Sequence, residues 1–160
     1  MSRKVLRDGR FACVALCVGC GTLVTIPDQT IFPSLESLAA SNQAVVRLYG
    51  RPIANLEQIA IHSWFLVKRA DAATFDRWEL QLDSREPYGH VWKNIIPADV
   101  LGPGAFVIAD RVGDEALTII DFIETASPVY DCMSEYFFLG PNSNTYIQWV
   151  LTSTNWNVTL

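Results

Sequence analysis

The chain has 160 residues, of which 50% are hydrophobic and 18% are charged, as expected of one globular domain with a leader. Four basic residues and one acidic residue stand in the first 19 positions. The remaining 8 basic and 16 acidic residues therefore give the rest of the chain a net charge of −8. This charge argues against nucleic acid as a partner, because phosphate binding needs a basic patch.

The first 26 residues have the layout of an export signal. Residues 2–10 are basic, residues 11–18 form a short apolar run, and small residues precede Cys20. The segment Leu16–Cys20 also resembles a bacterial lipobox, in which the thiol of Cys20 would carry a lipid. It departs from that pattern at Cys17, where leucine is usual.

Three interpretations of this leader stay open. The chain is a lipoprotein anchored through Cys20, or it keeps residues 1–26 as a signal-anchor helix, or the leader is cleaved and the product is free. The apolar stretch 11–26 is short against the roughly 20 residues that span a bilayer. All three interpretations place the domain in the bacterial cell envelope, facing the periplasm.

The cysteines and histidines indicate no metal or cofactor. Three of the four cysteines lie in the leader, so the body keeps only Cys132 and we expect no intramolecular disulfide. The two histidines, His62 and His90, are 28 residues apart, and no set of residues has the spacing of metal ligands.

In chain order, residues 27–42 read as a linker with one short helix over 34–40, and residues 43–160 as a single globular domain. β-Branched and aromatic residues predict a strand over 44–49 and a stronger one over 59–67. Alternation in the second strand puts His62 on the same face as Trp64 and on the opposite face from Ser63 and Phe65.

Residues 75–82 predict a third strand, antiparallel to the second because the connecting turn is too short for a crossover helix. In this strand Trp78, Leu80 and Leu82 alternate with Arg77, Glu79 and Gln81. Such alternation is typical of a sheet with one solvent-exposed side, so we expect the second set of residues to be exposed.

The remaining elements complete an α+β pattern. We expect a polar loop over 83–94, a strand over 105–109, a helix over 114–126, an irregular segment over 130–138 and a helix over 143–152. The predicted fold is an antiparallel sheet with two main helices packed on it.

The turn before the last helix, Leu139–Tyr146, contains several small polar residues. Pro141 restricts Gly140 to extended or turn geometry, and Asn142 or Ser143 is a suitable N-cap. N–H groups at the start of a helix can hold an anion or an oxyanion. This turn is the candidate site.

A set of motifs resembles one bacterial family: Ala44-Val45-Val46 with Leu48-Tyr49, Ile61-His62-Ser63-Trp64 with Val67-Lys68, Trp92 with Asn94, Gly113 with Ala116, and Gly140 to Tyr146 with Trp149. The family is DUF3750, uncharacterised membrane-associated proteins with a Gly-Pro-Asn-Ser-Asn-Thr-aromatic box. Tyr146 stands where phenylalanine is usual in that box. The resemblance implies membrane association and assigns no activity.

A second resemblance is to the circularly permuted papain-like proteins, including the lecithin retinol acyltransferase group. There a histidine on an early strand precedes a nucleophilic cysteine at a helix start, in an Asn-Cys-x-x-Phe-like turn. The stretch from Asn142 to Tyr146 is similar, with Ser143 in place of the cysteine. This resemblance implies Ser143 as nucleophile, His62 as base, and Glu79 or His90 as the group that orients the base.

The same residues have structural interpretations. Ser143 is a common N-cap, and His62 on an apolar strand fits a hydrogen-bonded core residue. A serine hydroxyl, unlike a cysteine thiol, cannot be activated by a lowered pKa alone.

We therefore favour a non-catalytic binding or scaffold domain, with Asn142, Asn144, Trp64 and Trp92 as candidate binding residues and a cell-envelope peptide or lipid as partner. The alternative is a Ser/His hydrolase or acyltransferase that acts on an amide or ester of the envelope.

Overall fold

The computed structural model of the chain describes residues 32–54, 60–158 and 160. The leader with Cys20 and residues 55–59 of the β1–β2 connection lie outside the described residues. The described part contains five strands: β1 (Val45–Pro52), β2 (Ile61–Lys68), β3 (Asp76–Arg85), β4 (Gly89–Lys93) and β5 (Phe106–Val112). They form one sheet in the order β4-β3-β2-β1-β5, and every neighbouring pair is antiparallel.

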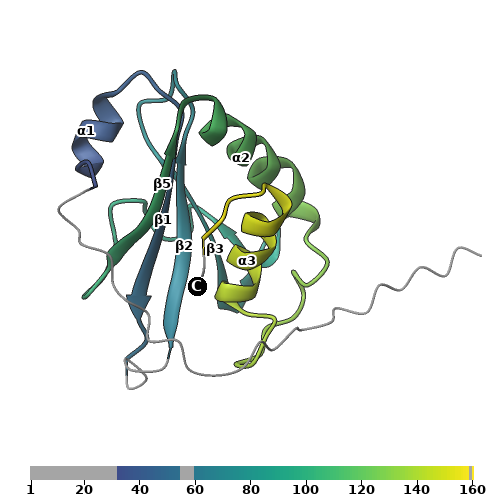
Figure 1. The fold of residues 1–160 in the computed structure, drawn as a ribbon. Coiled ribbons are helices and arrows are strands. Elements are labelled where there is room, and N and C mark those ends of the chain that lie inside the picture. Colours follow the sequence, from purple (N-terminus) through teal and green to yellow (C-terminus); the bar gives the residue numbers. More distant parts are fainter. Residues whose placement is uncertain (1–31, 55–59, 159) are drawn as a thin grey trace, which may run out of the picture.

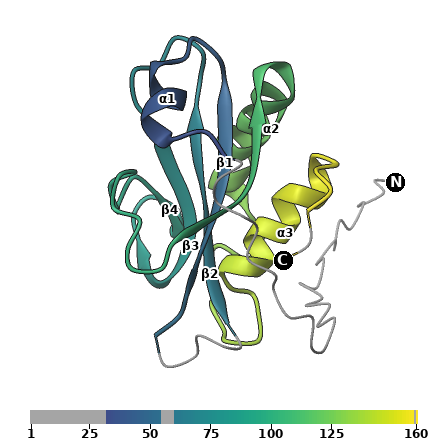
Figure 2. The same ribbon diagram turned by 60° about the vertical axis from the view of Figure 1, so that its left-hand side comes forward.

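Helices cover both faces of this sheet. The helices α2 (Gly113–Ala126) and α3 (Ser143–Ser153) lie on one face, which we call the α3 face, and α1 (Leu35–Ala40) lies on the other, the α1 face (Figures 1 and 2). A short 3-10 helix, η2 (Ser127–Val129), follows α2. The predicted α+β class is confirmed, and the helices and the antiparallel β2–β3 pair stand where the sequence predicts them.

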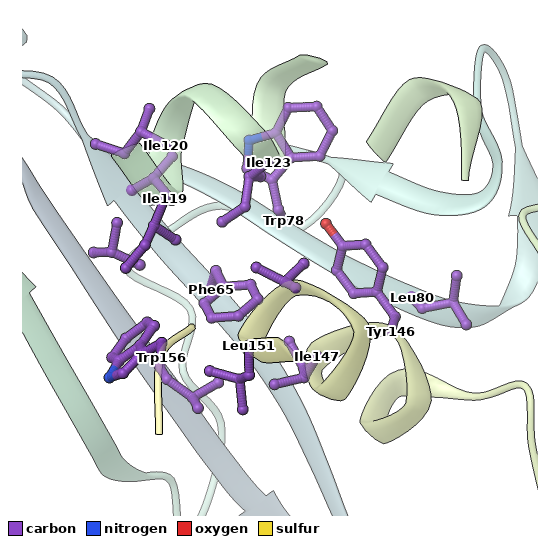
Figure 3. Packing of buried hydrophobic residues seen from close by; sticks show 14 of the residues in the cluster. Phe65, Trp78, Leu80, Ile119, Ile120, Ile123, Tyr146, Ile147, Leu151 and Trp156 are labelled. Atoms are coloured by element: carbon purple, nitrogen blue, oxygen red, sulfur yellow. The ribbon is translucent and has the colours of Figure 1, made fainter. Parts of the chain in front are cut away.

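The main core lies between the sheet and the helices of the α3 face (Figure 3). Phe65 of β2 and Trp78 of β3 are register partners, and both are buried against α2 and α3. The apolar positions of the two helices recur every three or four residues, which directs them all to the sheet. They are Ala116, Ile119, Ile120 and Ile123 in α2, and Tyr146, Ile147, Val150 and Leu151 in α3.

A second core occupies the α1 face. Leu38 of α1 packs with Val45, Tyr49, Trp64 and Leu66 of the two central strands. Because successive strand residues point to opposite faces, β1 and β2 are apolar on both sides, as expected of strands covered twice.

The expectation of a solvent-exposed side on β3 is therefore wrong. Arg77 and Glu79 are at most 2% exposed, whereas Leu82, on the supposedly buried side, is 67% exposed. The physical reason is that the α1 face is covered as well, so the polar residues of β3 are enclosed over its first half. Leu82 lies in the second half, where the β3–β4 ladder is irregular.

The polar loop expected over 83–94 contains a strand, β4, which corrects that expectation. Gly89 opens it with a positive φ of 63°, and a Cβ there would collide with the carbonyl oxygen of Met133. The next amide, of His90, donates to that same carbonyl at 2.7 Å. The segment after η2 therefore covers this edge strand.

The single cysteine of the body lies in the main core. Cys132 is 2% exposed there, and the other three cysteines lie outside the described residues. The described ranges 32–54 and 60–158 contain no helix with the length and apolar character needed to cross a bilayer.

Candidate functional site

A buried polar cluster lies on the α1 face around the carboxylate of Glu79. The register pairs Trp64 of β2 with Glu79 of β3, so His62 and Gln81, two residues further along, reach the same carboxylate. Glu79 Oε2 lies 2.8 Å from His62 Nε2 and accepts from Gln81 Nε2 at 2.6 Å. Arg77 pairs with both carboxylate oxygens, with its Nε 2.7 Å from Oε1.

Aromatic rings complete this cluster. The guanidinium of Arg77 lies 4.4 Å from the centre of the Trp64 ring, and the His62 ring stacks on the same indole at 5.7 Å. The Nη1 atom of Arg77 donates to the carbonyl of Val100 at 2.6 Å. The cluster is thus closed by its own members and by the loop that follows β4.

The Glu79 carboxylate is charged in this setting. Burial alone raises its pKa, but the hydrogen bonds from His62 and Arg77, together with the charge of Arg77, outweigh burial and hold the pKa of Glu79 below its ordinary value. The structure therefore brings together two of the predicted site residues, His62 and Glu79.

The start of α3 is closed by its own cap. Asn142 is the N-cap, and its side-chain oxygen accepts from the N–H groups of Asn144 at 3.1 Å and Thr145 at 3.2 Å. In return the hydroxyl of Thr145 accepts from the N–H of Asn142 at 2.6 Å, which completes a capping box. Two of the N–H groups that an oxyanion would use are therefore already occupied.

The other residues of the box tie α3 to its surroundings. The side-chain amide of Asn144 donates to the carbonyl of Ile61 on β2 at 3.1 Å. The fully buried hydroxyl of Tyr146 lies 2.7 Å from that of Ser127 in η2. Through these contacts, the Gly-Pro-Asn-Ser-Asn-Thr-Tyr box connects α3 to the sheet and to η2.

Ser143 is the first residue of α3 and is only 3% exposed. Tyr136, in the segment before the box, is its neighbour. Burial raises the pKa of Tyr136, and its interaction with Ser143 lowers it in part.

His62 and Ser143 are not brought together, which corrects the expected proton transfer between them. His62 contacts Trp64 and Glu79 on the α1 face. The helix that Ser143 begins packs on the opposite face, where its Tyr146 meets Phe65. Because β2 side chains alternate, the sheet lies between the imidazole and the serine.

His90 does not orient the His62 ring. Its Nδ1 lies 2.9 Å from the backbone carbonyl of Gln81, and its ring lies 5.9 Å from that of Tyr136. Among the predicted orienting groups, only Glu79 contacts His62.

The two tryptophans predicted to bind a ligand are both buried. Trp64 is fully enclosed, and Trp92 donates its indole N–H to the carbonyl of Asp83 at 2.9 Å. Binding by these residues, and by Asn142 and Asn144, stays a prediction. An open hollow of about 440 Å³ lies elsewhere, lined by Leu35, Glu36, Ala39, Ala73, Thr74, Phe75, Ala98 and Asp99.

Sequence reasoning missed the roles of Arg77, Gln81 and Tyr136. Arg77 and Gln81 lie on the same face of β3 as Glu79, and the signal that would have identified them was the paired strand, which places His62 beside them. Nothing in the local pattern marks Tyr136. Within the described ranges, no group of three or more His, Cys, Asp or Glu residues is arranged to hold a metal ion.

The fold and the site together define an α+β domain with a doubly covered antiparallel sheet and a self-capped polar box before its last helix. Residues 43–160 match the model of the DUF3750 family, proteins of unknown function, and the chain belongs to that family. No curated protein and no solved structure matches the chain.

Proposed function

We propose that the chain is an exported, membrane-anchored member of the DUF3750 family that works as a non-catalytic binding or scaffold domain in the bacterial envelope. This proposal rests on the N-terminus of α3, where the capping box already pairs two backbone N–H groups. Asn142 takes the N–H groups of Asn144 and Thr145, so the residues that resemble a catalytic turn satisfy one another.

Hydrolytic chemistry needs more than a serine at a helix start. The nucleophile needs a base within hydrogen-bond reach and free donors for the developing oxyanion. Ser143 is a neighbour of Tyr136, a weak base, and His62 is held by Glu79 across the sheet. The polar groups of both faces are thus paired in ways that stabilise the fold.

The alternative is a Ser/His hydrolase or acyltransferase of the permuted papain-like kind, acting on an amide or ester of the envelope. One contact favours it: Tyr136 touches both Ser143 and the ring of His90. This chain of contacts would relay a proton only through a phenol whose pKa burial has raised. We therefore place the binding domain first.

We expect that a fluorophosphonate probe labels neither the wild-type chain nor the Ser143→Ala variant above the level of the heat-denatured protein. Because Asn142 is the cap, the variant loses only the interaction with Tyr136, about 1 kcal/mol, and stays folded. The measurement is in-gel fluorescence, with circular dichroism of both proteins as the control for folding. Labelling of wild type that disappears in the variant would establish the hydrolase instead.

The anchor has its own test in the leader. We expect labelled palmitate to enter the wild-type chain and the Cys17→Ala variant but not Cys20→Ala, because only the last cysteine of a lipobox becomes the lipidated N-terminus. The two cysteines are three positions apart, which makes Cys17→Ala a matched control. Label retained in Cys20→Ala would rule out lipidation at that residue.

A further inference from the structure

The arginine near the end of β1, Arg51, differs from the other cations of the domain. The eight lysine and arginine residues after the leader all lie in the part of the chain that the structure describes. Six of them make ion pairs with carboxylates, and the ammonium of Lys68 donates to three backbone carbonyls. Among the described residues, the side chain of Arg51 has no hydrogen bond and no ion pair. Because 16 acidic residues accompany these eight cations, an unpaired guanidinium calls for an explanation.

The loop between β4 and β5 packs against this guanidinium. Arg51 is partly buried. A Cβ on Gly102 would lie 2.7 Å from the Nη1 atom of Arg51, and a Cβ on Gly104 would lie 3.5 Å from the ring of Pro52. The loop therefore passes directly over the last two residues of β1. A side chain that is already held in one place loses less conformational entropy when it binds a ligand.

His62 stands directly across from Arg51. The two residues are register partners of the antiparallel β1–β2 pair, at the lower end of the sheet in Figure 1. Side chains in directly opposite positions share one face and have Cβ atoms about 5 Å apart. Arg51 and His62 are therefore neighbours on the α1 face, where the His62 ring stacks on Trp64.

One nitrogen of the His62 ring is left for a ligand. Its Nε2 lies 2.8 Å from the carboxylate of Glu79, and because a charged carboxylate only accepts, Nε2 carries the hydrogen. In the neutral ring, Nδ1 is then an acceptor. Nδ1 has no hydrogen-bond partner among the described residues, and it is not one of their enclosed unpaired atoms, so it reaches solvent. The same holds for the guanidinium nitrogens of Arg51.

We propose that Arg51 and His62 form a binding site for the C-terminal residue of a peptide. The planar guanidinium of Arg51 pairs with the terminal carboxylate through two parallel N–H bonds. The terminal residue also carries an amide N–H close to its carboxylate, and Nδ1 of His62 accepts that hydrogen bond. A ligand with only one of these two groups leaves one member of the site without a partner.

The charge of the site favours a monoanion. Arg77 and Glu79, which lie behind the His62 ring, form an ion pair and cancel, so Arg51 leaves one positive charge. A carboxylate matches this charge. A phosphate dianion would add an uncompensated negative charge to a domain whose acidic residues already outnumber its basic residues by eight. We therefore expect a carboxylate ligand and use phosphate as a comparison.

This inference deepens the proposed binding function, and it rests on that function for the presence of a peptide partner. The test uses saturation-transfer difference NMR on the full chain in a non-ionic detergent. The probe is N-acetylalanine, which carries both groups of a peptide C-terminus. Of the three comparison compounds, N-acetylalaninamide lacks the charge, propanoate lacks the N–H, and inorganic phosphate has a second charge. N-Acetylalanine should bind about fivefold or more tightly than each of them, because each fails to satisfy one member of the site.

Two substitutions at Arg51 and a matched control locate the site. Arg51→Ala should weaken binding of N-acetylalanine about tenfold, and Arg51→Lys about threefold, because lysine keeps the charge but lacks the planar fork. The control is Arg85→Ala, which removes a 58% exposed side chain with a contact of 4.0 Å to Asp83. This variant should bind as wild type does. Circular dichroism shows whether each variant is folded.

Three results would overturn the proposal. They are unchanged affinity in Arg51→Ala, equal affinity for N-acetylalanine and its amide, and propanoate binding as tight as that of N-acetylalanine. The last result would mean that the site recognises a carboxylate alone. Fluorophosphonate labelling of Ser143 tests the binding-domain proposal on the other face of the sheet, so a failure of either proposal can be told from a failure of the other.

Discussion

Glu79→Gln is expected to lower the free energy of unfolding by about 3–5 kcal/mol, among the largest effects of any single substitution in this domain. The variant removes the negative charge that pairs with Arg77, which is 2% exposed. A guanidinium left without its counter-ion in this setting keeps its desolvation cost and loses the attraction that offsets it. His62 and Gln81 lose the same acceptor.

Urea unfolding followed by circular dichroism measures the effect, and Glu124→Gln is the matched control. Glu124 makes an equally short ion pair, 2.6 Å to Arg69, but the guanidinium of that pair is 44% exposed. An exposed pair is worth about 1 kcal/mol or less, so this variant should unfold almost as wild type does. A loss as small in Glu79→Gln as in Glu124→Gln would contradict the buried-cluster account.

The sign of the pH dependence follows from the lowered pKa of Glu79. The carboxylate contributes stability that is present above its ordinary pKa of about 4.5 and is lost as the pH falls through the folded-state value. In the same urea experiment, the difference in the free energy of unfolding between wild type and Glu79→Gln should therefore have its full size at pH 7. It should become smaller as the solution is acidified below about pH 4.5.

The buried polar cluster around Glu79 shows which part of the fold could not be predicted from the sequence. Alternation on β3 correctly separates Trp78 and Leu80 from Arg77 and Glu79. It cannot tell whether the polar face meets water, because that depends on α1 and on the loop near Val100, which are distant in sequence. For the same reason, the sequence of β2, which is apolar on both faces, does not indicate which face α3 covers.

The box before α3 shows a second limit. Sequence correctly indicates a helix start with Asn142 as a possible cap, because small polar residues and a proline favour one. It does not show what the N–H groups would bind. One side-chain torsion decides whether Asn142 accepts from Asn144 and Thr145 or leaves them for a ligand, and in the structure it accepts from both.

The side chain of Asn142 has two structural roles. Asn142 caps α3 with its oxygen and holds the carbonyl of Phe138 with its nitrogen. The motif that resembles a catalytic turn therefore couples the last helix to the turn that precedes it.

The second large effect is expected at Tyr146. Tyr146→Ala should lower the free energy of unfolding by about 3–5 kcal/mol, because it empties a fully buried site in the main core. The ring packs against Phe65 at 6.5 Å, Tyr130 at 5.5 Å and Trp149 at 5.9 Å between centroids. Urea unfolding measures the loss.

A double-mutant cycle separates the ring from its hydroxyl. Tyr146→Phe keeps the ring and leaves the buried oxygen of Ser127 without its partner, and Ser127→Ala leaves the phenol unpaired. Each should cost about 1–3 kcal/mol, whereas the double variant should cost less than the sum of the two, because neither orphaned group remains. Strict additivity would mean that the 2.7 Å contact carries no coupling, and the box would then fasten α3 by packing alone.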